Sequence, residues 1–427
     1  MSKILIKNGR IIDPSNNIDS FGDLLIENSK IVKVGQVSEE LAKDATEIDA
    51  TGKIVAPGLI DIHVHTREPG SEEKETIATC AASAAAGGFT TICCMPNTNP
   101  PLDHDSSIEY VYGQSARANQ SRVLPTGCIT KGRKGEELAE MSLMSSAGAV
   151  AFTDDGSGIM SSKLMKRALQ YAAMLEKPIM QHCEDKDLFG GCMNAGPVAV
   201  RLGLAGIPNA CEEIMLQRDI ALLDSNCSQY HAQHISTKGS IELIRDAKAK
   251  GLKVSAEATP HHLLLTDASC MNYDSNFKMN PPLRTYDDVQ ALRTAVADGT
   301  VECLATDHAP HTEEEKQLEF ALAPFGIIGL ECALGLYAKA LIESGACDWY
   351  TLIERMTAGP ANIINSPLGT LTEGQAADVT IIDPDMEWTV DIASFKSKAR
   401  NCPWDGWKLK GRATHTIVAG KLKFQLA

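Results

Sequence analysis

Histidine and aspartate residues follow several apolar runs of strand length. His63 and His65 come first, after the apolar run 53–60, which we expect to be a single buried strand. Residues two apart in a strand point to the same side, so both imidazoles would face the same way. Neutral imidazole is the commonest protein ligand of zinc, and two converging rings supply half of a tetrahedral shell. The pair indicates a metal site, although two hydrogen-bonded histidines would give the same pattern.

Later runs end in the same residue types. The full set of candidate ligands is His63, His65, Asp155, His182, His234 and Asp307. Four histidines and two carboxylates exceed the three protein ligands usual for one catalytic zinc, and they favour two metals bridged by a carboxylate, about 3.5–4 Å apart. We expect two zinc ions, although a single metal remains an alternative.

Five of the six candidates divide between the two metals. We assign His63 and His65 to one zinc and His182 and His234 to the other, with Asp155 as the bridge. A single zinc would leave the second histidine pair merely lining the pocket.

Three doublets leave the choice of residue open. Asp154 could replace Asp155 as the bridge, because side-chain direction is not fixed at a turn; the other aspartate would then be a capping or turn residue. His231 and His234 are three apart and face different ways on a strand, so His231 is expected in packing or as a partner of a ligand. We expect the pair 261–262 to be structural histidines.

The strands that carry these residues alternate with helical segments. Apolar runs end near residues 65, 95, 129, 152, 182, 234, 257 and 307, and helical periodicity is clear at 162–176 and 239–250. Eight such units predict a (β/α)8 barrel over residues 55–366, whose active site lies at the carboxyl ends of the strands. A doubly wound open sheet is the alternative.

Short alternating runs occupy both ends of the sequence. Residues 1–54 and 367–427 contain strand-like runs separated by turn residues. Because the termini of a domain are often close in space, we expect the two segments to form one small β-sandwich, an α/β fold overall.

Composition excludes several classes of protein. The formal net charge of −15 argues against a nucleic-acid partner, which would need clustered Lys and Arg. The sequence shows no leader and no apolar run long enough to cross a bilayer, so we expect no membrane partner. The thirteen cysteines form no C-x-x-C pair, which fits a reducing, cytoplasmic location.

The motifs themselves resemble a known family. Residues 57–65 (PGLIDIHVH) are similar to the opening motif of the amidohydrolase superfamily, and 66–70 (TREPG) resemble the dihydroorotases. Further similar segments are 95–101, 152–156, 256–262, 278–284, 305–311 and 323–331. The resemblance implies a zinc enzyme of pyrimidine biosynthesis that interconverts N-carbamoyl-L-aspartate and L-dihydroorotate by means of a zinc-bound hydroxide.

One departure from the superfamily pattern narrows the resemblance. Many relatives bridge their metals with a carboxylated lysine from the fourth strand, whereas residues 149–152 contain no lysine. This chain resembles the long-chain class of dihydroorotases, in which the second aspartate of a doublet is the bridge. The resemblance therefore favours Asp155 over Asp154.

The resemblance also implies contacts to the substrate. Asp307 would be the catalytic acid and base, and the remaining residues would bind substrate: His65, Arg67, Asn97, Asn280, His311, Phe325 and Gly326. The planar guanidinium of Arg67 suits a carboxylate, although an ion pair with Glu68 or Glu72 is the plainer alternative. We expect the Gly-punctuated segment 308–329 to be a mobile lid, or else a solvated loop.

Two other functions stay open. A hydantoinase or allantoinase would use the same barrel and cyclic amide chemistry. A catalytically silent partner of aspartate carbamoyltransferase would lack the metal histidines, which this chain keeps. The resemblance further implies a homodimer and a possible association with aspartate carbamoyltransferase.

Overall fold

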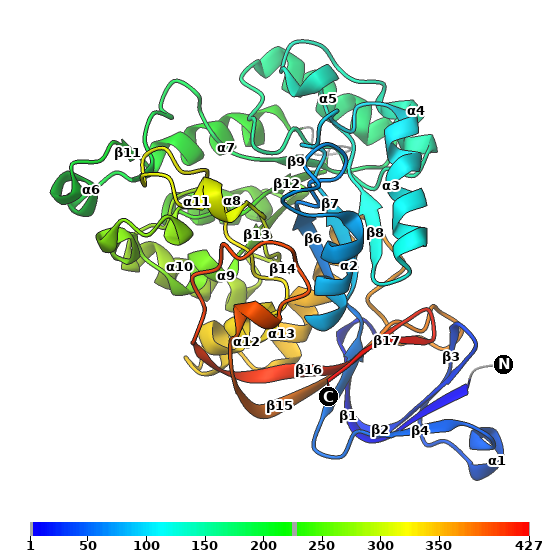
Figure 1. Ribbon diagram of the computed structural model, residues 1–427. Helices are drawn as coiled ribbons and strands as arrows, with labels where there is room; N and C mark the ends of the chain where they lie inside the picture. The colour runs from blue at the N-terminus through cyan, green and yellow to red at the C-terminus, as the bar shows by residue number, and fades with distance from the viewer. Residues whose placement is uncertain (1–2, 224–228, 427) are drawn as a thin grey trace.

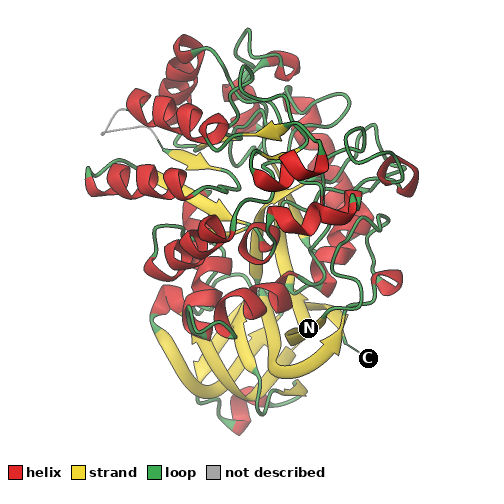
Figure 2. Ribbon diagram, turned by 90° about the vertical axis from the view of Figure 1, so that its left-hand side faces the viewer, coloured by secondary structure: helices red, strands yellow, loops and turns green. Residues whose placement is uncertain are grey.

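The chain forms a barrel above a strongly curved sheet (Figure 1). The computed structural model describes residues 3–223 and 229–426. The first and the last strands lie in the curved sheet, whose strands Figure 2 shows in yellow, and the middle of the chain, cyan to yellow in Figure 1, forms the barrel. None of the helices in these two ranges is long and apolar enough to cross a membrane.

Parallel strands close the barrel. Its strands are β6 (Leu59–Val64), β7 (Phe89–Cys94), β8 (Arg122–Pro125), β9 (Ile179–Gln181), β12 (Tyr230–Ala232), β13 (Val254–Ala258) and β14 (Cys303–Leu304). They pair in parallel as β6-β7-β8 and as β9-β12-β13-β14. Phe152 links the two groups through parallel bridges to Gly127 and Ile179, and Val64 bridges to His308. The predicted (β/α)8 barrel is confirmed, but its fourth strand position, expected at 149–152, holds only this bridge residue.

Helices surround the barrel. The longer ones are α2 (Ile77–Ala86), α3 (Asp105–Ala118), α5 (Ser162–Met174), α7 (Ala210–Leu222), α8 (Lys238–Ala249), α10 (Tyr286–Asp298) and α13 (Trp349–Met356). Shorter elements are α4 (Met141–Ser146), α6 (Pro197–Leu202), α9 (Pro260–Leu264), α11 (Glu313–Lys316), α12 (Ala333–Tyr337), α14 (Ala358–Ile363), β10 (Met193–Asn194) and β11 (Gly206–Ile207).

The two helices expected from periodicity are present as α5 and α8. The Ser161 side chain accepts a hydrogen bond from the Leu164 amide at the start of α5, and Thr237 does the same for Ser240 in α8. The apolar stripe of each helix is buried against the barrel.

The segments from the two ends of the chain come together, as predicted, and their strands form one mixed sheet. The sheet contains β1 (Lys3–Asp13), β2 (Ile18–Glu27), β3 (Lys30–Gly35), β4 (Thr46–Asp49), β5 (Ile54–Pro57), β15 (Val379–Thr389), β16 (Lys408–Val418) and β17 (Lys421–Gln425), with α1 (Glu39–Ala42) at its edge. β5 pairs with β1 and with β15, so it joins the amino-terminal strands to the carboxyl-terminal ones. Apolar side chains from both ends of the chain pack together in one hydrophobic core of this sheet.

The expectation of one strand over 53–60 is wrong. The run contains β5, in the terminal sheet, and the start of β6, in the barrel, with Gly58 between them. A Cβ atom on Gly58 would collide with the side chain of Thr90 on β7, so the chain crosses between the two sheets where no side chain fits. The division into 1–54, 55–366 and 367–427 stays a prediction; β5 spans its first boundary.

Replacing Gly58 with Ala tests this crossing. Overpacking against Thr90 costs about 1–3 kcal/mol, so the thermal unfolding midpoint should fall. Gly113, inside α3, is the control, because a methyl group added there would have no neighbouring atom within 4 Å. Gly113→Ala should raise the midpoint, since Ala favours a helix interior by about 0.5–1 kcal/mol. An unchanged midpoint for Gly58→Ala would contradict the close contact.

Candidate active site

Asp61 fixes the strand that carries the first two histidines. Its carboxylate accepts hydrogen bonds from the His63 amide (3.0 Å) and from the Thr306 amide (3.0 Å) and hydroxyl (2.6 Å). Burial raises the pKa of Asp61 to about 7. The side chain therefore ties the end of β6 to the end of β14, and it sets His63 beside Asp307.

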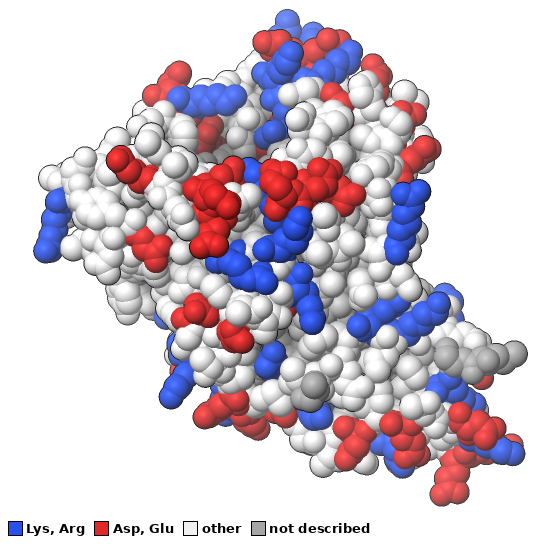
Figure 3. Space-filling view, in the orientation of Figure 1, with Lys and Arg blue, Asp and Glu red and all other residues white. Residues whose placement is uncertain are grey.

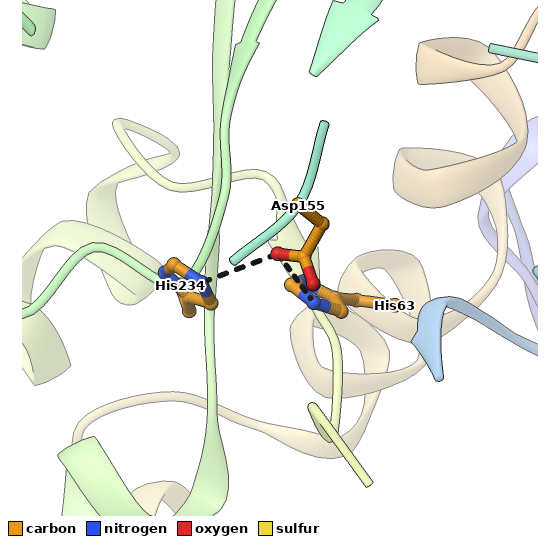
Figure 4. A group of neighbouring side chains, drawn as sticks. All are labelled: His63, Asp155 and His234. Carbon is orange, nitrogen blue, oxygen red and sulfur yellow. Dashed lines mark ion pairs between the residues drawn. The ribbon is translucent and has the colours of Figure 1, made fainter. Parts of the chain in front are cut away.

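Asp155 lies at the centre of the histidines. Figure 4 shows its carboxylate between the rings of His63 and His234. Asp155 Oδ1 is 3.4 Å from His63 Nε2 and 3.8 Å from both His234 Nε2 and His182 Nδ1. The other oxygen, Oδ2, is 3.6 Å from His65 Nε2. One carboxylate thus faces all four candidate histidine ligands.

Asp307 faces the first histidine pair. Its Oδ1 is 2.8 Å from His65 Nε2 and 3.4 Å from His63 Nε2. Asp307, His234 and Arg67 all have left-handed backbones, with φ of 46°, 32° and 60°. Such conformations are costly for residues other than glycine, and they cluster where function requires an unusual side-chain direction.

The donor set fits a metal. Two groups in the described chain have ligand atoms within 4.8 Å of one another, His63 with Asp155 and His234, and His63 with His65 and Asp307. Three atoms of the first group, His63 Nε2, Asp155 Oδ1 and His234 Nδ1, are buried without any hydrogen-bond partner among the described residues. Buried polar atoms without partners are rare, and imidazole with carboxylate is a normal set for zinc.

The local charges favour a cation in the cluster. Burial opposes protonation of His63, but the surrounding carboxylates, Glu257 foremost, raise its pKa well above the ordinary value. Burial opposes ionisation of Asp155, but the neighbouring His63 and His234 lower its pKa well below the ordinary value. The buried carboxylates therefore create a field that stabilises positive charge on the histidines or between them.

His182 stands at the edge of the cluster. Its Nδ1 is 2.8 Å from His234 Nε2, and its Nε2 is 3.4 Å from Glu184 and 3.3 Å from Asn280. Asn280 donates a hydrogen bond to the same Glu184 carboxylate (2.6 Å). His182 is thus next to the other candidate ligands but lies outside the two closest groups.

The doublets differ in what they contact. Asp154 turns away from the histidines and accepts hydrogen bonds from the amides of Ile129 (2.8 Å) and Thr130 (3.0 Å). His231 is fully buried and contacts Ser255 and Glu257. Both histidines of the pair 261–262 are buried, and His262 lies between the Thr259 hydroxyl and the Pro281 carbonyl.

A cavity of about 340 Å³ opens onto the cluster. All residues expected to bind substrate line it: His65, Arg67, Asn97, Asn280, His311, Phe325 and Gly326. Arg67 is the one Lys or Arg on its described wall. Its Nε donates to the Pro310 carbonyl (3.0 Å), and its Nη2 lies 3.4 Å from His311 Nε2.

Asn97 connects the cavity to the metal cluster. Its amide nitrogen donates to Asp155 Oδ2 (3.2 Å), and its amide oxygen lies 3.0 Å from His65 Nδ1. The Asn97 oxygen therefore accepts from the His65 Nδ1–H, which leaves His65 Nε2 for Asp307 or a metal.

Two lysines hold the segment that covers the cavity. Lys278 Nζ donates to the carbonyls of Ala321 (3.0 Å) and Ala323 (2.6 Å), and Lys316 Nζ donates to those of Pro324 (3.0 Å) and Gly326 (3.1 Å). These contacts fix the backbone that presents Phe325 and Gly326.

The helix α11, in the same segment, is acidic. Acidic side chains gather around it on the face shown in Figure 3. Glu315 Oε1 lies 2.7 Å from Lys74 Nζ, so α11 is tied to the chain that follows β6. The mobility of 308–329 stays a prediction.

Sequence reasoning missed four polar residues around the ligands. Asp61, Glu184, Gln233 and Glu257 are buried and contact the candidate metal ligands or their backbones. Asp61 and Glu257 interrupt apolar runs that form strands, and a carboxylate inside such a run was the available signal. Glu184 and Gln233 lie in loops and gave none.

Comparison with known proteins shows the family. The family model described as dihydro-orotase-like matches residues 52–240. The chain is 49% identical over 426 residues to dihydroorotase from Syntrophotalea carbinolica, covering 100% of both chains. It is 49% identical over 424 residues to dihydroorotase from Pelotomaculum thermopropionicum, covering 99% of each. The chain belongs to the dihydroorotase family.

Solved structures share the fold. L-hydantoinase (dihydropyrimidinase) from Arthrobacter aurescens superposes with a TM-score of 0.88 at 25% identity, covering 100% of this chain and 98% of that one. Dihydropyrimidinase from Brevibacillus agri gives 0.84 at 20% identity, with 99% and 96% covered. The resemblance to dihydroorotases is confirmed, and the identity to hydantoinases is much lower than to dihydroorotases.

The aspartate doublet allows a direct test of the cluster. Asp155→Asn should weaken zinc binding at least about tenfold, because it removes the charge that faces all four histidines. Asp154→Asn should leave zinc binding unchanged and lower stability by about 1–3 kcal/mol, since it disturbs a buried acceptor of backbone amides. Zinc competition with a chelator and thermal unfolding measure both; loss of zinc in Asp154→Asn alone would reverse the assignment.

Proposed function

We propose that this chain is a dihydroorotase that catalyses the reversible cyclisation of N-carbamoyl-L-aspartate to L-dihydroorotate, with loss of water, in pyrimidine biosynthesis. The observation that carries the proposal is the cavity in which Arg67 and Asn97 lie beside the buried Asp155 and Asp307. To bind and open a cyclic amide that carries a carboxylate, a site of this kind needs a guanidinium for the carboxylate beside residues that can hold a metal. The dihydroorotases at 49% identity support the same reaction.

We further propose that the site holds two zinc ions. His63 and His65 would hold one, and His182 and His234 the other, with Asp155 between the two pairs. Zinc held by these residues would supply a Lewis acid that lowers the pKa of bound water and polarises a carbonyl oxygen. Asn97 and Asp61 keep His65 and the His63 backbone in place for this role.

Asp307 would move the proton. Burial alone would raise its pKa, but His63 and His65 lower the pKa to about 2, so the carboxylate is ionised at neutral pH. Asp307 can therefore accept a proton from the attacking water and deliver it to the amide nitrogen that leaves when the ring opens. In the direction of ring closure the same oxygen takes the proton from that nitrogen.

Replacing Asp307 with Asn separates this role from metal binding. The amide keeps the shape of the side chain but cannot take the proton, so turnover should fall about 10²–10⁴-fold. Zinc content should stay largely intact, because the four histidines and Asp155 remain. Near-normal turnover of L-dihydroorotate by this variant would remove Asp307 from the mechanism.

Arg67 would select a substrate that carries a carboxylate. L-dihydroorotate has this group, whereas dihydrouracil is the same ring without it. A guanidinium binds a carboxylate through two parallel hydrogen bonds, which gives both energy and orientation. The chain should therefore open L-dihydroorotate in preference to dihydrouracil, while a dihydropyrimidinase would show the opposite preference.

Arg67→Met measures this selection. Hydrogen bonds to a charged group are worth about 1.5–3 kcal/mol, so kcat/KM for L-dihydroorotate should fall about 10–100-fold while the low rate with dihydrouracil changes little. Arg67→Lys keeps the charge without the planar fork and should fall between the two. An equal loss on both rings would mean that Arg67 supports the site as a whole and does not select the carboxylate.

Three expectations from the sequence stay predictions. They are the homodimer, the association with aspartate carbamoyltransferase and the cytoplasmic location.

A further inference from the structure

Glu257 has no role in the function proposed above, although it belongs to the similar segment 256–262. It lies on β13 in the barrel interior, with no exposed surface. Its Oε1 is 2.5 Å from His63 Nδ1, and its Oε2 is 3.0 Å from His231 Nε2. The carboxylate therefore sits directly behind a candidate metal ligand.

The Glu257 contact fixes the proton on His63. A carboxylate only accepts, so Nδ1 must carry the hydrogen and Nε2 keeps its lone pair. Gln233 Nε2 lies farther from the same nitrogen, at 3.3 Å, and as a donor it does not compete for this hydrogen. His63 Nε2, the atom left free, faces Asp155 and Asp307 at 3.4 Å.

The same oxygen also fixes a second ligand. Glu257 Oε1 accepts a hydrogen bond from the backbone amide of His234 (3.0 Å). His234 has a left-handed backbone with φ of 32°, which needs outside support. One buried oxygen atom thus sets the ring of His63 on β6 and the backbone of His234 after β12.

A chain of hydrogen bonds holds Glu257 from behind. His231 Nε2 donates to Glu257 Oε2, and His231 Nδ1 then accepts from the Ser255 hydroxyl at 2.8 Å. Ser255 lines a cavity of about 500 Å³ at the amino-terminal ends of β12 and β13. The chain runs through the barrel from the metal cluster toward the opposite end.

We propose that Glu257, supported by His231 and Ser255, is a positioning residue that presents His63 and His234 together to the metal pair. The inference rests on the metal centre of the proposed function. A carboxylate behind a ligating imidazole fixes its orientation and makes it a better donor, and loss of such partners costs about 10–100-fold in metal affinity.

The test measures the zinc affinity of the full chain by competition with a chelator. Glu257→Gln keeps the shape and removes the charge, and it should weaken zinc binding about 10–100-fold. His231→Gln, one step farther from the ligands, should weaken zinc binding by a smaller factor than Glu257→Gln. Ser255→Ala, farther still, should weaken it least. Cobalt in place of zinc should show an altered visible absorption spectrum in Glu257→Gln, which reports ligand geometry.

Asp219→Asn is the matched control. Asp219 is equally buried and accepts from Tyr230 on β12 (3.0 Å), but none of its hydrogen bonds reaches a candidate ligand. It should lower thermal stability without changing zinc affinity or the cobalt spectrum.

The outcomes separate the inference from the function. A wild-type chain that binds no zinc at the cluster would overturn the metal centre itself. Wild-type zinc affinity in Glu257→Gln, with a functional wild-type site, would overturn only the inference. If Glu257→Gln does not fold, His231→Gln decides, because unchanged zinc affinity and cobalt spectrum in that variant would also overturn it.

Discussion

The structure depends on a group of carboxylates and imidazoles that are buried together. Asp155 and Asp307 have almost no exposed surface, and they face four histidines across 2.8–3.8 Å. Ionised groups away from water are costly unless opposite charge compensates them. Cations between these ligands would supply that compensation, and the partnerless atoms of His63 and Asp155 point to the same solution.

The barrel makes this concentration of charge possible. Its parallel strands end around one mouth, so residues as distant in sequence as His63 and Asp307 come within 3.4 Å. This arrangement requires locally unfavourable features. Arg67, His234 and Asp307 have left-handed backbones, and the carboxylate of Asp61 is buried where it holds two strand ends together. Buried hydrogen-bond partners support the ligands from behind, and the segment held by Lys278 and Lys316 lies in front of them, so that one small cavity remains.

Much of this could be predicted from the sequence, because it depends on local pattern. Strand and helix periodicity gave the barrel, and ligand types at strand ends gave the residues that the structure brings together. The motif resemblance chose Asp155 over Asp154, which periodicity alone left open, and Asp155 does face the histidines. Each of these inferences uses only neighbours in the chain or a known motif.

The parts that failed depend on contacts between distant residues. Residues 54–60 have no polar side chain, so no alternation could show that Gly58 divides the run between two sheets. At the fourth strand position the backbone hydrogen bonds of residues 150–153 go to segments distant in sequence, around Gly127 and Ile179, and only Phe152 forms ladder bridges. The role of Glu257 depends on His63, 194 positions away. The hydrophobic pattern of a sequence predicts which residues are buried, but it does not predict which partner a buried polar group will contact.

Titration of the metal-free chain with zinc, while the opening of L-dihydroorotate is followed, tests the central claim most directly. The account predicts no turnover without metal and activity that rises until about two zinc ions are bound per chain. Full turnover in the metal-free chain, or zinc bound at the cluster without any ring opening, would contradict it.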